Sequence, residues 1–273
     1  MASIKHITKR DIVAVIVLVV FLLLNLATVG ASGRRRAKEF VCQSNLRQWA
    51  LVFQNCVRDN NGQFLTGDRG SGFWWPVQLD ERTQSWKQNK TWFCPTATSP
   101  VQDEYDRVTG GFTRLSAWGV YASGHSRLNP DGIAGSYALN GYMLDIQGAW
   151  GAMSEGRRSS DFWKTLQPQG ASRIPLMLDA TRFDVWPSES SAPPETEAAV
   201  WPSRSNHMAS GCINRHDGAV NCLFADGSVR KVGLKELWTL KWHRTFNTQG
   251  PWTQAGGVGP QHWPQWMREF KEY

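Results

Sequence analysis

The stretch Ile12–Ala31, IVAVIVLVVFLLLNLATVGA, decides the fold, because it is twenty residues long, carries no charge and is polar only at Asn25 and Thr28. At 1.5 Å of rise per residue, a helix of this length spans about 30 Å, the thickness of the hydrocarbon core of a bilayer. The stretch therefore predicts a transmembrane helix near the N-terminus.

A cleaved secretory signal is the alternative, with Lys5, Lys9 and Arg10 as its basic region and a small-residue site before Ser32. What favours a retained helix is the sequence that follows, where apolar residues recur at spacings near three and four. These residues are Phe40, Val41, Leu46, Trp49, Ala50, Phe53 and Val57. The run Asp59-Asn60-Asn61-Gly62 then predicts the end of the helix, because Asn and Gly tolerate the left-handed conformation.

Composition indicates a globular, loop-rich domain beyond this helix. The chain has 273 residues, of which 41% are hydrophobic, with 25 Gly and 13 Pro. Seven basic and two acidic residues in the first forty account for +5 of the net charge of +7, which leaves +2 for the rest. A basic cluster beside an apolar run predicts contact with membrane lipid, and we expect no nucleic-acid partner.

Two turns mark the clearest local structure, from Arg215 to Val232. Asp217-Gly218 and Asp226-Gly227 both match the type I′ hairpin turn, which predicts a three-stranded antiparallel meander. Its second turn would pair Phe224 with Val229 and place Val220, Cys222, Phe224 and Val229 on one face. Its first turn would pair Cys212 with Leu223, which disfavours a disulfide between Cys212 and Cys222.

Other head elements are shorter. Ile174–Asp179 predicts an apolar strand with Asp179 as a turn former at its end, and Leu234–Phe246 predicts a short helix. His216 and Asp226 are each next to a Gly in a turn, so we interpret both as turn residues more readily than as ligands.

The sequence offers no recognisable catalytic or metal-binding motif. The five cysteines, at positions 42, 56, 94, 212 and 222, include no C-x-x-C pair and no zinc-finger spacing with His. We therefore expect no catalytic residue, no metal site and no cofactor, with calcium as the one ion left open. From the sequence, we expect a protein that is not an enzyme.

Five separated stretches nevertheless resemble one family. Cys42-Gln43-Ser44-Asn45-Leu46-Arg47-Gln48 is similar to its C-x-x-N-L-R-Q segment, and Asp59-Asn60-Asn61-Gly62 to its helix exit. Phe93-Cys94-Pro95, Ser136-Tyr137-Ala138-Leu139-Asn140, and His216 followed after nine residues by Asp226-Gly227 match its other segments in order. The family is that of bacterial proteins with a prepilin-type cleavage/methylation region and an H-x9-DG motif.

This resemblance implies signature positions and processing positions. The signature residues are Cys42, Asn45, Leu46, Arg47, Gln48, His216, Asp226 and Gly227. Aligning Asp11 with the acidic fifth residue of mature pilins puts His6 at the Gly before the cut and Ile7 at the Phe after it. Assembly or processing would therefore involve His6, Ile7 and Asp11.

The resemblance also implies the fold and the biological role. We expect an α+β, pilin-like fold in which a long N-terminal helix packs on an antiparallel sheet. Its parts would be a leader and transmembrane segment (1–33), an amphipathic continuation (34–61) and a β-rich head (62–273). The implied protein is a pseudopilin-like subunit of a type II secretion or type IV pilus-like assembly, with other pilin-like subunits as partners. Its expected location is the bacterial inner membrane, as a single-pass protein with its head in the periplasm or an extracellular filament.

Two other functions remain open at this point. A tethered or secreted glycan-binding module would use exposed aromatic rings, for which Trp74, Trp75, Trp118 and Trp252 are the candidates, although packing in a loop-rich core is the favoured explanation of large rings. A secreted hydrolase would need a pocket in which acids and His converge.

Overall fold

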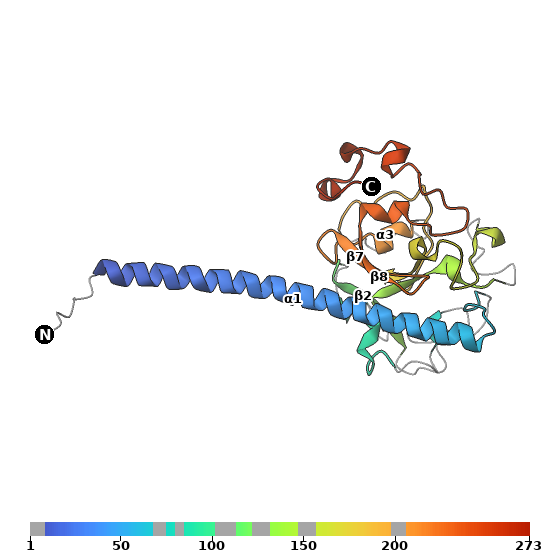
Figure 1. The fold of residues 1–273 in the computed structure, drawn as a ribbon, viewed down its shortest axis with the longest axis horizontal. Coiled ribbons are helices and arrows are strands. Elements are labelled where there is room, and N and C mark those ends of the chain that lie inside the picture. The colour runs from blue at the N-terminus through green and yellow to red at the C-terminus, as the bar shows by residue number, and fades with distance from the viewer. Residues whose placement is uncertain are drawn as a thin grey trace.

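A single helix, α1 (Lys9–Asp59), organises the molecule; it is 51 residues long. In Figure 1 its N-terminal part projects away from the head, while its C-terminal part lies against the head. The computed structural model describes residues 9–67, 75–79, 85–101, 113–121, 132–146, 157–197 and 206–273, of which Asp11, residues 22–29, Val77, Val120 and Tyr121 are described by backbone alone. The predicted continuation of the helix beyond residue 33 is confirmed.

The predicted helix end is confirmed as well. Asn61 and Gly62 have φ angles of 53° and 86°, in the left-handed region that closes a helix. The amide of Gly62 donates to the carbonyl of Val57 at 2.9 Å, which satisfies one of the last carbonyls of α1.

The predicted membrane anchor requires a correction. Among the residues that the structure describes, none of the helices combines the length and the apolar character needed to cross a bilayer. The prediction of a single-pass inner-membrane protein, with residues 1–33 as its anchor, is therefore wrong.

The described part of the head contains two β-sheets, so the fold is mixed α+β. The larger sheet has the order β6-β4-β5-β7-β8 and the smaller one β1-β2-β3. Most neighbouring strands are antiparallel as predicted, but β4 pairs with β6, and β1 with β2, in parallel. The strands are β1 (Ser99–Pro100), β2 (Ser116–Tyr121), β3 (Ile133–Gly135), β4 (Tyr137–Asn140), β5 (Pro175–Asp179), β6 (Asp184–Val185), β7 (Ala219–Phe224) and β8 (Val229–Gly233).

Short helices and long connections fill the rest of the head. Besides α1, the elements are α2 (Trp75–Gln78), α3 (Met208–Gly211), and the 3-10 turns η2 (Lys90–Trp92), η3 (Gly141–Met143), η4 (Ser159–Asp161), η5 (Ala171–Arg173), η6 (Lys235–Thr239), η7 (Gln254–Gly256), η8 (Pro260–His262) and η9 (Gln265–Met267). The predicted strand over 174–179 is confirmed as β5. The predicted helix over 234–246 is in fact the shorter η6.

The β7–β8 hairpin differs from the prediction by one residue. Leu223 pairs with Val229, and the amide of Phe224 donates to the carbonyl of Ser228 at 2.8 Å. The turn therefore has three residues and ends at Gly227, whose φ of 85° is typical of a G1 bulge and not of a two-residue type I′ turn. Val229 consequently lies on the face opposite Val220.

The predicted first strand of the meander is also wrong. Cys212 is the C-cap of α3 and does not pair with Leu223, whose sheet partners are Met177 and Val229. The Asp217-Gly218 turn itself is present, with φ angles of 49° and 77°. Cys212 and Cys222 are both thiols, in line with the disfavoured disulfide.

Aromatic rings fix the C-terminal half of α1 to the head. Trp49 is buried and its indole N–H donates to the carbonyl of Thr91 at 3.0 Å. Its ring centroid lies 5.4 Å from that of Trp75 and 4.8 Å from that of Trp92, both edge-on. Edge-to-face pairs of this kind add about 0.5–1.5 kcal/mol each to the burial of their surface. The other face of the sheet packs against the C-terminal segment around Trp238.

We predict that Trp49→Ala lowers the free energy of unfolding by about 3–5 kcal/mol, because it removes a buried ring and leaves a cavity. The matched control is Leu51→Ala, since Leu51 is in the same helix but 61% exposed, and its effect should stay within about 0.5 kcal/mol. Urea unfolding of the two variants checks this. Equal midpoints would contradict the packing of α1 described above.

Candidate functional site

Residues from three of the family-like stretches meet, together with Asp179, at one buried centre. Cys42 comes from α1, Cys94 from the loop after η2, Asp179 from the end of β5, and His216 from the turn before β7. All four residues are buried, and one potential ligand atom from each lies within 4.8 Å of the others. We call this set the Cys-Asp-His centre.

Asp179 holds the centre together. Its Oδ1 accepts a hydrogen bond from Arg215 Nη1 at 3.2 Å, and its Oδ2 accepts from the amide of Asn221 at 2.8 Å. His216 Nε2 lies 3.1 Å from the same Oδ2. Burial would raise the pKa of Asp179, but the charges and hydrogen bonds of His216, Arg215 and Asn221 outweigh it and lower the pKa to about 2.

The histidine and the two thiols are coupled to this carboxylate. His216 Nε2 is 3.4 Å from Cys94 Sγ, and Cys42 Sγ is 3.6 Å from Asp179 Oδ1. Burial lowers the pKa of His216, yet the charge of Asp179 and its hydrogen bond raise it to about 10. Burial raises the pKa of Cys94, but hydrogen bonding with Cys42 and His216 lowers it to about 6. Burial, followed by hydrogen bonding with Cys94, raises the pKa of Cys42 well above its usual value.

Arg215 connects the centre to the two sheets. Its guanidinium is fully buried and donates to the carbonyls of Ser136 and Ser116 at 2.7 and 2.8 Å, besides its ion pair with Asp179. These carbonyls belong to the β3–β4 junction and to β2. A buried carboxylate is tolerated when it is paired and hydrogen-bonded in this way.

Other residues of the family-like stretches support the same centre. Asn45 Nδ2 donates to the carbonyl of Phe93 at 2.8 Å, so the helix holds the loop that carries Cys94. The amide of Cys94 donates to Ser136 Oγ, and the hydroxyl of Tyr137 donates to Cys42 Sγ at 3.4 Å. The three stretches that start at Cys42, Phe93 and Ser136 are thus adjacent in space.

Comparisons with family models, curated proteins and solved structures give no match to this chain. The resemblance drawn from the sequence therefore stays a prediction.

The centre does not have the geometry of a catalytic triad. A Cys-His-Asp triad needs the nucleophile on one ring nitrogen of His and the carboxylate on the other. Here Cys94 Sγ and Asp179 Oδ2 both face Nε2 of His216, at 3.4 and 3.1 Å. All three side chains are also buried. The hydrolase alternative consequently has no support from this centre.

The remaining predicted positions fall outside the centre. Leu46 is buried in the core, whereas Arg47 and Gln48 are exposed on α1. Asp226 is exposed and accepts a hydrogen bond from the amide of Ser228 at 2.9 Å, so its interpretation as a turn residue is confirmed. Gly227 supplies the left-handed residue of that turn. His6 and Ile7, together with the side chain of Asp11, lie outside the described residues.

The tryptophans proposed for glycan binding need a correction. Trp75 and Trp118 are buried, with 3% and 1% of their surface exposed, and Trp252 is half-buried against the C-terminal core. Trp74 lies outside the described part of the chain. Rings in the core cannot stack on a polysaccharide, so the prediction that Trp75 and Trp118 are surface contacts is wrong.

Sequence reasoning missed Asp179 and Arg215 and misread His216. The sequence predicts Asp179 as a turn former and His216 as a turn residue. In the structure both side chains are buried and paired with each other. A usable signal was present in Ile174–Asp179, because an acid that ends a fully apolar strand must find a partner inside the protein. Arg215, directly before His216, is that partner.

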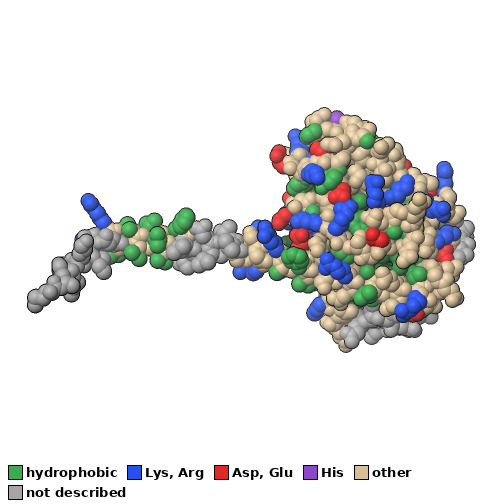
Figure 2. Space-filling view, in the orientation of Figure 1, with side chains coloured by type: hydrophobic (Ala, Val, Ile, Leu, Met, Phe, Trp, Pro, Cys, Tyr) green, Lys and Arg blue, Asp and Glu red, His purple; other side chains and the backbone are tan. Residues whose placement is uncertain are grey.

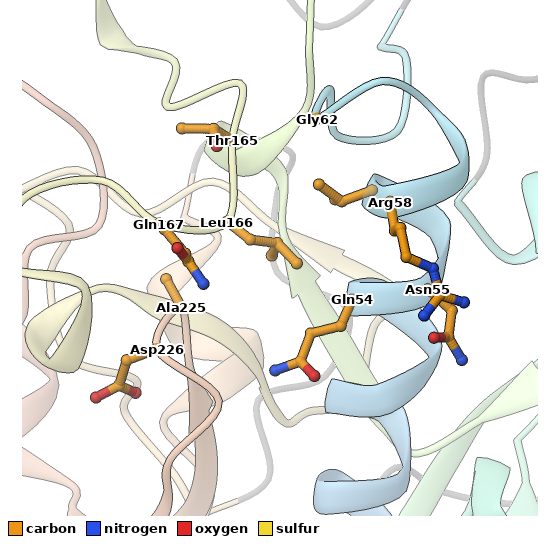
Figure 3. Close-up of a pocket in the computed structure, with 10 residues that line it drawn as sticks. Gln54, Asn55, Arg58, Gly62, Thr165, Leu166, Gln167, Ala225 and Asp226 are labelled. Atoms are coloured by element: carbon orange, nitrogen blue, oxygen red, sulfur yellow. The ribbon is translucent and has the colours of Figure 1, made fainter.

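A cleft of about 500 Å³ lies elsewhere, between the end of α1, the loop at residues 165–167 and the β7–β8 turn. Figure 3 shows side chains of Gln54, Arg58 and Gln167 around it, with Asp226 at the edge. Its lining is polar but brings together no thiol or imidazole. We assign it no chemistry.

We predict that Arg215→Met destabilises the fold by about 3–5 kcal/mol, because it breaks the fully buried ion pair between its guanidinium and the carboxylate of Asp179. The matched control is Arg114→Met, which breaks an ion pair with Glu197 in which both side chains are more than 40% exposed. Exposed pairs contribute about 0–1 kcal/mol. Thermal and denaturant unfolding would contradict the assignment if both variants lost the same stability.

Proposed function

We propose that this protein is a non-enzymatic, pseudopilin-like subunit, which assembles with other pilin-like subunits through the projecting part of α1. The observation that carries the proposal is the surface of that helix. Figure 2 shows hydrophobic side chains along the projecting rod, away from the head. Nine large apolar residues here are 46–64% exposed: Ile12, Val13, Val15, Ile16, Val17, Leu18, Val19, Val20 and Phe21.

The distribution of these residues indicates several neighbours. Because they occupy almost consecutive positions, they surround the helix instead of forming one stripe. A helix that is hydrophobic on all sides is normally buried among other elements. One partner would cover one side, whereas a bundle of helices from several subunits would cover all of them.

The basic residues that follow support an axial offset between subunits. Arg34, Arg35, Arg36 and Lys38 are exposed, directly before the point where α1 reaches the head. Helices packed in register would bring these charges together, and like charges repel. Subunits displaced along the helix axis avoid this contact, which suits a filament-like assembly.

The head suits the role of a rigid body carried by the helix. Glu39, at the start of the packed part of α1, pairs with Lys231 of β8 at 3.0 Å. Gln43 Nε2 donates to Asn221 of β7 at 3.0 Å, one residue after Cys42 enters the buried centre. The two halves of α1 therefore have separate tasks: one is fixed in the head and the other is left for partners.

We predict that the full chain self-associates and that Ile16→Asp combined with Val20→Asp weakens this association. Burying one such side chain contributes about 1.5–3 kcal/mol, so the dissociation constant should rise by roughly 100-fold or more. Sedimentation velocity over a range of concentrations measures it.

The matched control carries Leu51→Asp and Leu115→Asp, two exposed apolar residues of the described surface that lie off the projecting rod. This control should associate like the parent chain, and a chain that lacks residues 1–33 should stay monomeric. The proposal fails if the parent chain is a monomer throughout, or if both double variants lose association equally.

A further inference from the structure

The four potential ligand atoms of the Cys-Asp-His centre lie close enough to one another to surround a single metal ion. Four atoms define six edges, and three of these are short interatomic distances. They are 3.1 Å from His216 Nε2 to Asp179 Oδ2, 3.4 Å from His216 Nε2 to Cys94 Sγ, and 3.7 Å from Cys42 Sγ to Asp179 Oδ2. All six edges are within 4.8 Å. Bonds of about 2.0–2.3 Å from a zinc ion to such atoms give tetrahedral edges of about 3.3–3.8 Å.

We propose that Cys42, Cys94, Asp179 and His216 together bind one Zn²⁺ ion as a closed structural site. Two thiolates, an imidazole and a carboxylate are ligands that zinc accepts, and thiolates disfavour magnesium and calcium. All four side chains are buried, and the cleft between the end of α1 and the β7–β8 turn does not reach them. A buried site with four protein ligands holds its metal and leaves no position for a substrate.

Formal charges balance around the ion. Two thiolates and the carboxylate supply three negative charges, while Zn²⁺ and the buried guanidinium of Arg215 supply three positive ones. The centre with zinc is therefore neutral, as burial in a low-dielectric core demands. Without Arg215 the same ligand set would leave one buried charge uncompensated.

Further contacts hold three of the four proposed ligands in place. Arg215 binds Oδ1 of Asp179 and leaves Oδ2 facing the other ligands. Tyr137 donates to Cys42 Sγ at 3.4 Å, and Thr96 Oγ1 lies 2.9 Å from Cys94 Sγ. Hydrogen bonds to the ligands of a metal orient them and commonly change affinity by about 10–100-fold.

A disulfide between Cys42 and Cys94 is the competing use of the two thiols. A disulfide would give no role to the imidazole beside Cys94 or to the carboxylate beside Cys42, which are the other two potential ligands. Zinc uses all four groups. It would also cross-link α1, the loop after η2, β5 and the turn before β7 at a single point.

The test uses the full chain, purified without a metal-binding tag, and measures bound metal by elemental analysis. We expect about one zinc per chain. Exchange for Co²⁺ should give the absorption bands of tetrahedral cobalt together with sulfur-to-cobalt charge transfer. In Cys94→Ala, the apparent dissociation constant for Zn²⁺ should rise by at least about 100-fold.

The matched control is Cys212→Ala, which removes another buried thiol, located in the opposite core. It should bind zinc like the parent chain. If Cys94→Ala does not fold, the cobalt spectrum of the parent chain decides alone. The proposal is overturned by a folded parent chain that takes up neither Zn²⁺ nor Co²⁺, by a mass that shows a Cys42–Cys94 disulfide, or by a cobalt spectrum without sulfur ligands.

Discussion

One buried carboxylate determines how the rest of the molecule is arranged. Asp179 has no exposed surface, so its charge must be balanced and hydrogen-bonded inside the protein. Arg215, His216 and the amide of Asn221 provide this, and Cys42 and Cys94 lie beside them. The contact places α1 and a loop from the first hundred residues against the sheet. A change at Asp179 would therefore affect segments that are far apart in the sequence.

The division of α1 into two halves follows from this centre. On the C-terminal side of Cys42, the helix buries Leu46, Trp49 and Phe53 against the head, and the aromatic rings around Trp49 hold it there. Before Cys42, the large apolar side chains between Ile12 and Phe21 are exposed on every side of the helix. In the proposed assembly, the packed half of α1 would hold the head while the projecting half contacts other subunits.

Local features of the fold could be predicted from the sequence, whereas most long-range contacts could not. Periodicity and the Asp-Asn-Asn-Gly run were enough for the extent and the end of α1, because both signals are local. The β7–β8 register could not be read from Asp226-Gly227, since a two-residue turn and a three-residue turn with a bulge use the same Asp-Gly pair. The membrane span inferred from Ile12–Ala31 rested on composition, and the described helices do not bear it out.

The buried centre shows a different limit. Cys42, Cys94, Asp179 and His216 are spread over 175 positions, so no spacing rule for metal sites could group them. The similarity of three stretches to one family marked Cys42, Cys94 and His216 but gave no reason for their chemistry. Only the pairing of strands and the docking of α1 bring in Asp179, and the same packing turns Trp75 and Trp118 from apparent surface rings into core residues.

Hydrogen exchange measured by mass spectrometry on the parent chain and on Asp179→Asn tests the central claim most directly. Loss of the carboxylate charge should reduce protection together in residues 42–56 of α1, in β5 and in the turn at 215–216, because one contact stabilises all three. A loss of protection confined to β5, with residues 42–56 as protected as in the parent chain, would show that Asp179 does not hold the helix to the head.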